Sequence, residues 1–178
     1  GRVPNTQGLN AEGIGIEFDR KAIRTDAHMR TNIPHIYAIG DVNGKVMLAH
    51  TASHEGMVAV ADICGQGEEM RYDRIPSCVY LEPEIACIGL TEAQAVAEGY
   101  DVITAVAATD DKAHYYEDAS FFIIKLIADK ASRRLLGAQI IGPGAVDKMA
   151  DIAVTAIAMR AALSDLDNLD LSYAPPFS

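Results

Sequence analysis

The stretch at residues 36–48, IYAIGDVNGKVML, constrains the fold more than any other part of this sequence. Its first four residues are apolar and predict a short buried strand, which Gly40 and Asp41 end. After a loop, residues 48–64 place apolar side chains at helical spacing and predict a helix. A strand followed by a helix in this way delivers the Asp41 carboxylate beside a helix N-terminus, which favours bound negative charge. We therefore expect a polar cofactor at this point of the chain.

The segments on either side of this stretch predict short strands and a domain boundary. Residues 14–18 alternate between apolar and polar side chains, which is typical of a strand, and residues 20–25 predict a second strand paired with it. After the helix, residues 66–74 form a polar connector. We interpret this connector as the boundary between two domains, residues 1–69 and residues 70–178.

The second domain is predicted to be α+β. Strands are expected at residues 77–81, 84–90, 101–108, 120–128 and 134–141. Thr91 and Gln94 form a capping box at the start of a short helix. A long helix is expected at residues 145–162, and Ser164 is expected to cap a last helical turn. Because strands and helices do not alternate as βαβ units, we expect an antiparallel sheet with helices on one face.

The long helix is apolar on nearly every side, which is typical of a helix buried on two sides. One side is expected to pack on the sheet. The other side would meet a partner subunit in a homodimer, or would be covered by other parts of a larger chain. We expect the homodimer.

Composition excludes several classes of partner. The chain has 178 residues and a net charge of −10, which argues against nucleic acid and against anionic membranes, and it has no apolar run long enough to span a bilayer. Its three cysteines, Cys64, Cys78 and Cys87, form no CxxC pair and predict reduced, buried thiols in a cytoplasmic protein. No metal site is predicted. The chain begins without Met, and we expect both of its ends to lie inside a longer protein.

A series of motifs resembles one enzyme family. The motifs are GRVPN at residues 1–5, IYAIGDV at 36–42, MLAH at 47–50, PSCVY at 76–80, PEIA at 83–86 and IGLTE at 88–92. The first three resemble the FAD-dependent pyridine nucleotide-disulfide oxidoreductases, which include dihydrolipoamide dehydrogenases, glutathione reductases and coenzyme A disulfide reductases. The last three resemble the start of the C-terminal dimerisation domain of that family.

The resemblance implies FAD as the cofactor and NAD(P)H as the reductant of the parent enzyme. Gly40 and Asp41 match the family's motif whose aspartate binds the ribityl hydroxyl of FAD. The segment that lies by the pyrimidine edge of the flavin, at a helix N-terminus, is matched by Met47, Leu48, Ala49 and His50. From the residues alone, Asp41 could also be a turn carboxylate that caps its own loop.

The end of the chain resembles one branch of the family. Dihydrolipoamide dehydrogenases and glutathione reductases end in a catalytic His-Pro-Thr, but no histidine of this chain precedes a proline. The tail instead resembles coenzyme A disulfide reductases, in which two tyrosines of the partner subunit reach the active-site thiol. Tyr115 and Tyr173 match these tyrosines. On spacing alone both could be ordinary interface residues, and His114 is another candidate acid-base group.

Three functions follow as hypotheses. The first is the C-terminal part of a disulfide reductase that moves electrons from NAD(P)H through FAD to coenzyme A disulfide or a related low-molecular-weight disulfide or persulfide. The second is a dihydrolipoamide dehydrogenase-like enzyme, and the third is a dimerisation module without a cofactor. The family's redox cysteine and glycine-rich fingerprints are not found in this sequence. We therefore expect this fragment alone not to complete a redox cycle.

Overall fold

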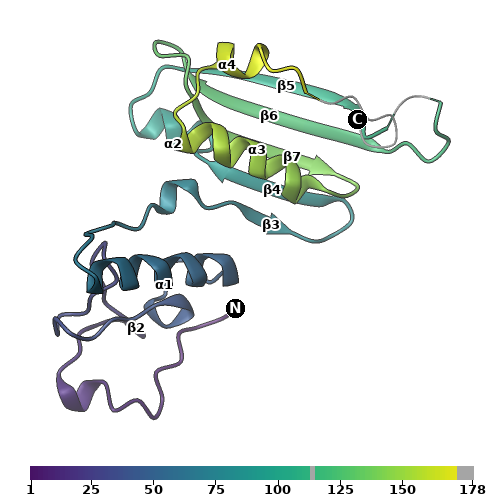
Figure 1. Cartoon of the computed structure of the whole chain (residues 1–178). Coiled ribbons are helices and arrows are strands. Elements are labelled where there is room, and N and C mark those ends of the chain that lie inside the picture. The colour runs from purple at the N-terminus through teal and green to yellow at the C-terminus, as the bar shows by residue number, and fades with distance from the viewer. Residues whose placement is uncertain (113–114, 172–178) are drawn as a thin grey trace. The chain divides into compact units, whose positions relative to one another are not determined.

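The chain forms two compact units, Gly1–Arg71 and a second unit that begins at Tyr72. The computed structural model describes residues 1–112 and 115–171. Figure 1 shows the helices and strands of each unit.

The first unit is built from short elements around one long helix. Its elements are η1 (Glu12–Ile14), β1 (Phe18–Asp19), β2 (Ala22–Ile23), η2 (Gly40–Asn43) and α1 (Ala49–Ile63). Strands β1 and β2 pair antiparallel, with Phe18 opposite Ile23. A small core forms where the side chains of Ala11, Ile16, Ile23 and Ala38 are buried together. Helix α1 corresponds to the helix predicted after the glycine-aspartate pair.

The prediction of a strand at residues 36–39 was wrong. In this segment the structure has a single bridge, between Arg30 and Tyr37. The Ala38 N–H donates to the Met29 carbonyl at 3.1 Å, but no described strand lies along the other edge of the segment. The strand predicted at residues 14–18 is also shorter than expected. Gly15 has a φ of +82° and ends η1, so the extended backbone begins only after it.

The second unit is an α+β domain, as predicted. Its elements are η3 (Tyr72–Arg74), β3 (Ser77–Val79), β4 (Glu84–Gly89), α2 (Glu92–Ala97), β5 (Val102–Asp110), β6 (Phe121–Asp129), β7 (Leu135–Gly142), α3 (Val146–Ala158) and α4 (Leu163–Asp167). The five strands form one antiparallel sheet in the order β3-β4-β7-β6-β5. Helix α3 lies across strands β4 and β7 (Figure 1).

Helix α3 and the sheet form the core of this unit. The buried side chains on the sheet are Ala86, Ile88, Phe122, Leu135, Ala138 and Ile140, and those on the helix are Val146, Ala150, Ala153 and Ala156. Alanine recurs on the buried face of α3, which allows the helix backbone to approach the strands closely. Leu163 and Leu166 of α4 pack against the same core, so α3 and α4 share one face of the sheet.

The short helix α2 departs from this one-sided arrangement. Ile124 and Leu126 pack toward α3, so the intervening Lys125 points to the opposite face by strand alternation. Lys125 Nζ contacts Glu92 of α2 at 2.5 Å. The predicted capping box is present, because Thr91 Oγ1 accepts from the Gln94 N–H and the Gln94 side chain accepts from the Thr91 N–H.

Helix α3 ends earlier than predicted. Arg160 has a φ of +56°, and the Ala161 N–H donates to the Ala156 carbonyl at 2.8 Å, which closes the last turn in a Schellman-type arrangement. The predicted cap at Ser164 was also wrong. The residue before α4 is Ala162, and its N–H donates to Asp165 Oδ2 at 2.7 Å.

Candidate cofactor site

The predicted cofactor residues lie on a tight turn, η2, in front of α1. Gly40 begins the turn with a φ of +73°, a conformation that costs a residue with a side chain. A Cβ at this position would lie 3.2 Å from the Cβ of Ala52 on the helix. Gly44 closes the turn with a φ of +66°, and its N–H donates to the Asp41 carbonyl at 3.2 Å. Glycine at both ends thus allows the turn to pack tightly against α1.

A buried carboxylate of α1 bonds the turn from within. Glu55 is 0% exposed, and its Oε2 accepts from the Gly40 N–H at 2.5 Å and from Asn43 Nδ2 at 2.9 Å. Sequence reasoning missed this residue. Its spacing from Thr51, four residues earlier, and from Asp62, seven residues later, places all three on one face of the helix, and that spacing was the available signal.

The side chain of Asp41 points away from Glu55 and the helix, toward solvent. Its side chain is exposed and has no hydrogen bond or ion pair to any residue that the structure describes. The neighbouring positions Gly40 and Asn43 are both bonded inward. The one carboxylate of the turn is therefore directed to solvent and available to a ligand.

The first turn of α1 offers backbone donors beside Asp41. The first helical hydrogen bond runs from the Ala52 N–H to the Leu48 carbonyl at 3.0 Å, and no side chain caps the helix. Its first turn contains no acidic residue. The N–H groups of the first three residues, Ala49, His50 and Thr51, consequently have no intrahelical acceptor. Such a terminus attracts an anion or an electron-rich carbonyl.

Thr51 adds an unsatisfied polar group next to this terminus. Its side chain is 1% exposed, and its Oγ1 has no hydrogen-bond partner among the described residues. Buried hydroxyls usually have a partner. Of the other predicted residues, Met47 and Leu48 are half-buried, whereas Ala49 and His50 are exposed. The structure thus brings all six predicted cofactor residues together in one turn and helix start.

The loop between the turn and the helix is held by two basic side chains. Lys45 Nζ donates to the carbonyls of Thr25 and Asp26 at 3.2 and 3.1 Å, and burial lowers the pKa of this lysine. Arg2 donates to the Met47 carbonyl at 3.3 Å. These contacts fix the loop to the N-terminal part of the unit.

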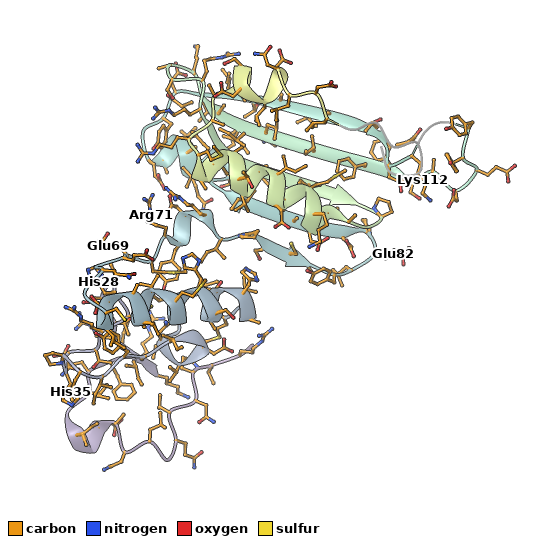
Figure 2. All side chains as sticks on the ribbon, in the orientation of Figure 1. His28, His35, Glu69, Arg71, Glu82 and Lys112 are labelled. Carbon is orange, nitrogen blue, oxygen red and sulfur yellow. The ribbon has the colours of Figure 1, made fainter. Side chains whose placement is uncertain are left out.

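A second buried carboxylate, Asp62, anchors the other end of α1. Arg30 donates to it twice, at 2.5 and 2.6 Å, and the Tyr37 phenol donates at 2.6 Å. The hydrogen bond from Tyr37, followed by that from Arg30, lowers the pKa of Asp62. His28 lies beside Glu69 on the segment that leaves the helix (Figure 2), with 3.9 Å between His28 Nε2 and Glu69 Oε1.

Of the two predicted tyrosines, the one that the structure describes belongs to the second unit. Tyr115 lies in the segment between β5 and β6, is 70% exposed, and has its ring centroid 4.9 Å from that of Tyr116. The same segment contains Lys112, labelled in Figure 2, which pairs with Asp118 at 2.5 Å. Tyr173 and His114 lie outside the described residues.

The cysteines show no redox arrangement in the part of the chain that is described. All three are free; Cys64 is exposed, and burial raises the pKa of the half-buried Cys78 and Cys87. Within residues 1–112 and 115–171, no group of three or more histidine, cysteine or acidic side chains could hold a metal ion. None of the helices in those ranges has the length and hydropathy needed to cross a membrane.

The chain matches curated relatives over most of its length. It is 43% identical to dihydrolipoyl dehydrogenase of Bacillus subtilis (strain 168) over 157 residues, which are 86% of this chain and 33% of that protein. It is 40% identical to dihydrolipoyl dehydrogenase of Mycobacterium tuberculosis over 159 residues, which are 86% of this chain and 34% of that protein. The chain thus spans about a third of the length of the curated relatives it matches.

Two solved structures have the same fold. The NAD-dependent persulfide reductase from A. fulgidus is 34% identical, with a TM-score of 0.78 over 98% of this chain and 35% of that chain. The reduced CoADR-RHD of Bacillus anthracis is 30% identical, with a TM-score of 0.81 over 100% of this chain and 34% of that chain.

Two family models divide the chain between them. The model of the pyridine nucleotide-disulphide oxidoreductases matches residues 1–56, and the model of their dimerisation domain matches residues 75–178. The turn and helix described above lie in the first match, and the antiparallel sheet lies in the second. The chain therefore belongs to the pyridine nucleotide-disulphide oxidoreductase family.

Proposed function

We propose that this chain supplies the flavin-contacting turn and the dimerisation domain of an FAD-dependent NAD(P)H:disulfide oxidoreductase. Residues 1–69 would be the C-terminal remnant of the FAD/NAD-binding region, and residues 70–178 the dimerisation domain of a homodimer. Members of the family use FAD and NAD(P)H. The observation that carries the proposal is the exposed carboxylate of Asp41, which has no partner among the described residues and lies beside the uncapped start of α1.

The residues present fit FAD. The Asp41 carboxylate can accept hydrogen bonds from ribityl hydroxyls, and the N–H groups of Ala49 and His50 can donate to the pyrimidine edge of the flavin. A helix N-terminus stabilises nearby negative charge by about 0.3–1 kcal/mol. Bound FAD would supply the two-electron redox chemistry. The role of these residues is to bind the cofactor and to orient it.

For the substrate, we propose a low-molecular-weight disulfide of the coenzyme A disulfide type. No histidine of this chain precedes a proline, so the usual His-Pro-Thr acid-base group is not found in the sequence. Tyr115 is 70% exposed and can reach a group outside its own unit. Together with Tyr173, it would hold a proton near the partner's reactive thiol, although a phenol with a pKa near 10 is a weak acid. The similar solved structures, a persulfide reductase and CoADR-RHD, support this choice.

A second candidate is a dihydrolipoamide dehydrogenase-like enzyme. The observation that favours it is the 43% identity to a dihydrolipoyl dehydrogenase, which is higher than the identity to either solved structure.

Steady-state assays of the intact protein that contains this chain separate these candidates. We expect NAD(P)H-dependent reduction of coenzyme A disulfide, with Tyr115→Phe and Tyr173→Phe each lowering kcat about ten-fold or more. Tyr100→Phe, just after α2, is the matched control. Turnover confined to dihydrolipoamide would exclude the disulfide substrate. An intact protein that dimerises without binding any flavin would instead be a dimerisation module.

A further inference from the structure

We infer that Glu55 is a positioning residue, which fixes the direction of Asp41 and so sets the affinity of this turn for flavin. The inference rests on the proposed function, because it assigns a ligand to Asp41. It adds a residue that touches neither the cofactor nor the solvent.

The hydrogen bonds explain how Glu55 could act at a distance. Its Oε2 accepts from both ends of the four-residue turn, from the Gly40 N–H at 2.5 Å and from Asn43 Nδ2 at 2.9 Å. Asp41 lies between these two anchored positions and has no side-chain bond of its own to any described residue. The direction of its carboxylate therefore depends on the backbone of the turn, which Glu55 holds at both ends.

The burial of Glu55 points to a specific role. The residue is 0% exposed on a helix face where Val58 and Ala59 are also buried, so an apolar side chain would be compatible with this environment. A buried carboxylate is costly unless its oxygens are bonded. Lys45 lies close enough for its charge to interact favourably with Glu55. The charged acceptor is thus matched to the donors of the turn.

The replacement Glu55→Met removes the shared acceptor at a similar side-chain length. The Gly40 N–H and the Asn43 amide then both lose their partner, because both donate to the same oxygen, Oε2. We expect the dissociation constant for FAD to rise about ten-fold. The conservative variant Glu55→Gln keeps an amide oxygen that can accept both hydrogen bonds, and we expect it to retain most of the affinity.

A double-mutant cycle with Asp41→Asn separates positioning from general stability. FAD is titrated into the intact apoprotein and followed by flavin fluorescence, with unfolding measured in parallel. Glu12→Met, at an exposed glutamate, is the matched control. If Glu55 acts through Asp41, Glu55→Met weakens FAD binding in the native background and has little effect in the Asp41→Asn background.

The outcomes that overturn the inference are distinct from those that overturn the proposed function. Equal losses from Glu55→Met in both backgrounds, or no loss from Glu55→Met while Asp41→Asn weakens binding, would remove the positioning role and leave the flavin site standing. Unchanged FAD affinity in Asp41→Asn would remove the flavin contact itself, and the inference with it. A loss of affinity in Glu55→Gln as large as that in Glu55→Met also counts against positioning.

Discussion

The Tyr37 phenol donates to Asp62 Oδ2 at 2.6 Å and so joins the segment that leads into the turn to the last turns of α1. Glu55, two helical turns earlier, accepts from the turn itself. The turn that carries Asp41 is thus connected to one helix at two levels. Changes at either carboxylate should alter the first unit in different ways, one in its stability and one in its binding.

Replacing Asp62 should change how the stability of the first unit depends on pH. The pKa of Asp62 is lowered in the folded state by Tyr37 and Arg30, so the unfolded state binds its proton at higher pH. The stabilisation is complete above the ordinary carboxyl pKa of about 3.9 and is lost as pH falls through the lower folded value. We expect Asp62→Asn to lower the urea midpoint at pH 7 and to flatten the loss of stability below about pH 4. Asp19→Asn is the exposed control, and an unchanged acid slope in Asp62→Asn contradicts this account.

Substitutions at two neighbouring positions of the turn should differ in how much they destabilise the fold. Gly40→Ala introduces a side chain at a φ of +73° and against Ala52, and we expect it to cost about 1–2 kcal/mol of unfolding free energy. Asp41→Asn breaks no contact within the described chain, so its stability should stay within about 0.5 kcal/mol of the native value. Urea unfolding measures the free energy of unfolding of both variants. A larger loss in Asp41→Asn than in Gly40→Ala would show that the Asp41 side chain makes a stabilising contact.

The close approach of the Gly137 backbone to Leu90 predicts a severe effect of a single methyl group. A Cβ at Gly137 would lie far inside the contact distance of the Leu90 carbonyl oxygen, and backbone atoms cannot move aside cheaply. We expect Gly137→Ala to cost about 3 kcal/mol. Gly144→Ala, where no heavy atom lies within 4 Å, is the control. Thermal unfolding of the two variants should differ clearly, and equal values would contradict so close an approach of the two backbones.

Self-association should depend on the outer side of α3. Ile152 and Met159 are 51% and 76% exposed, although the helix packs its other side on the sheet. We expect Ile152→Glu to weaken dimerisation about ten-fold or more, because a charge at a buried interface is costly. Val106→Glu places the same charge on the exposed face of β5 and serves as the comparison. Light scattering over a concentration series measures the dimerisation of both variants. Weaker dimerisation in Val106→Glu alone would assign the interface to the sheet.

Elements that depend on local chemistry could be predicted from the sequence. The reciprocal bonds of Thr91 and Gln94 need only the two residues and their spacing, and the structure has them. The strands β5 to β7 and the helix α1 follow from hydrophobic periodicity in the same way. The six residues predicted to bind the cofactor lie together because they are consecutive or nearly so, and their role stays a prediction.

Features that depend on partners far along the chain were missed. Residues 36–39 have the composition of a strand, but strand structure requires a ladder, and a single bridge forms. Glu55 was missed because a glutamate in a helix normally lies on the solvated side. Its role depends on donors 12 and 15 residues earlier, which no local pattern specifies. Ser164 shows a further limit, because this ordinary capping residue stands inside the first turn of α4, after Ala162, which precedes the helix.

The inward bonding of the turn by Glu55 has a consequence for the timing of ligand binding. A loop that needs its ligand for its shape binds in two kinetic steps, a fast encounter and a slower ordering. Here Gly40 and Asn43 already have their acceptor in the absence of any ligand. Association at this turn should therefore proceed in a single phase, with an observed rate that rises linearly with ligand concentration and reaches no plateau.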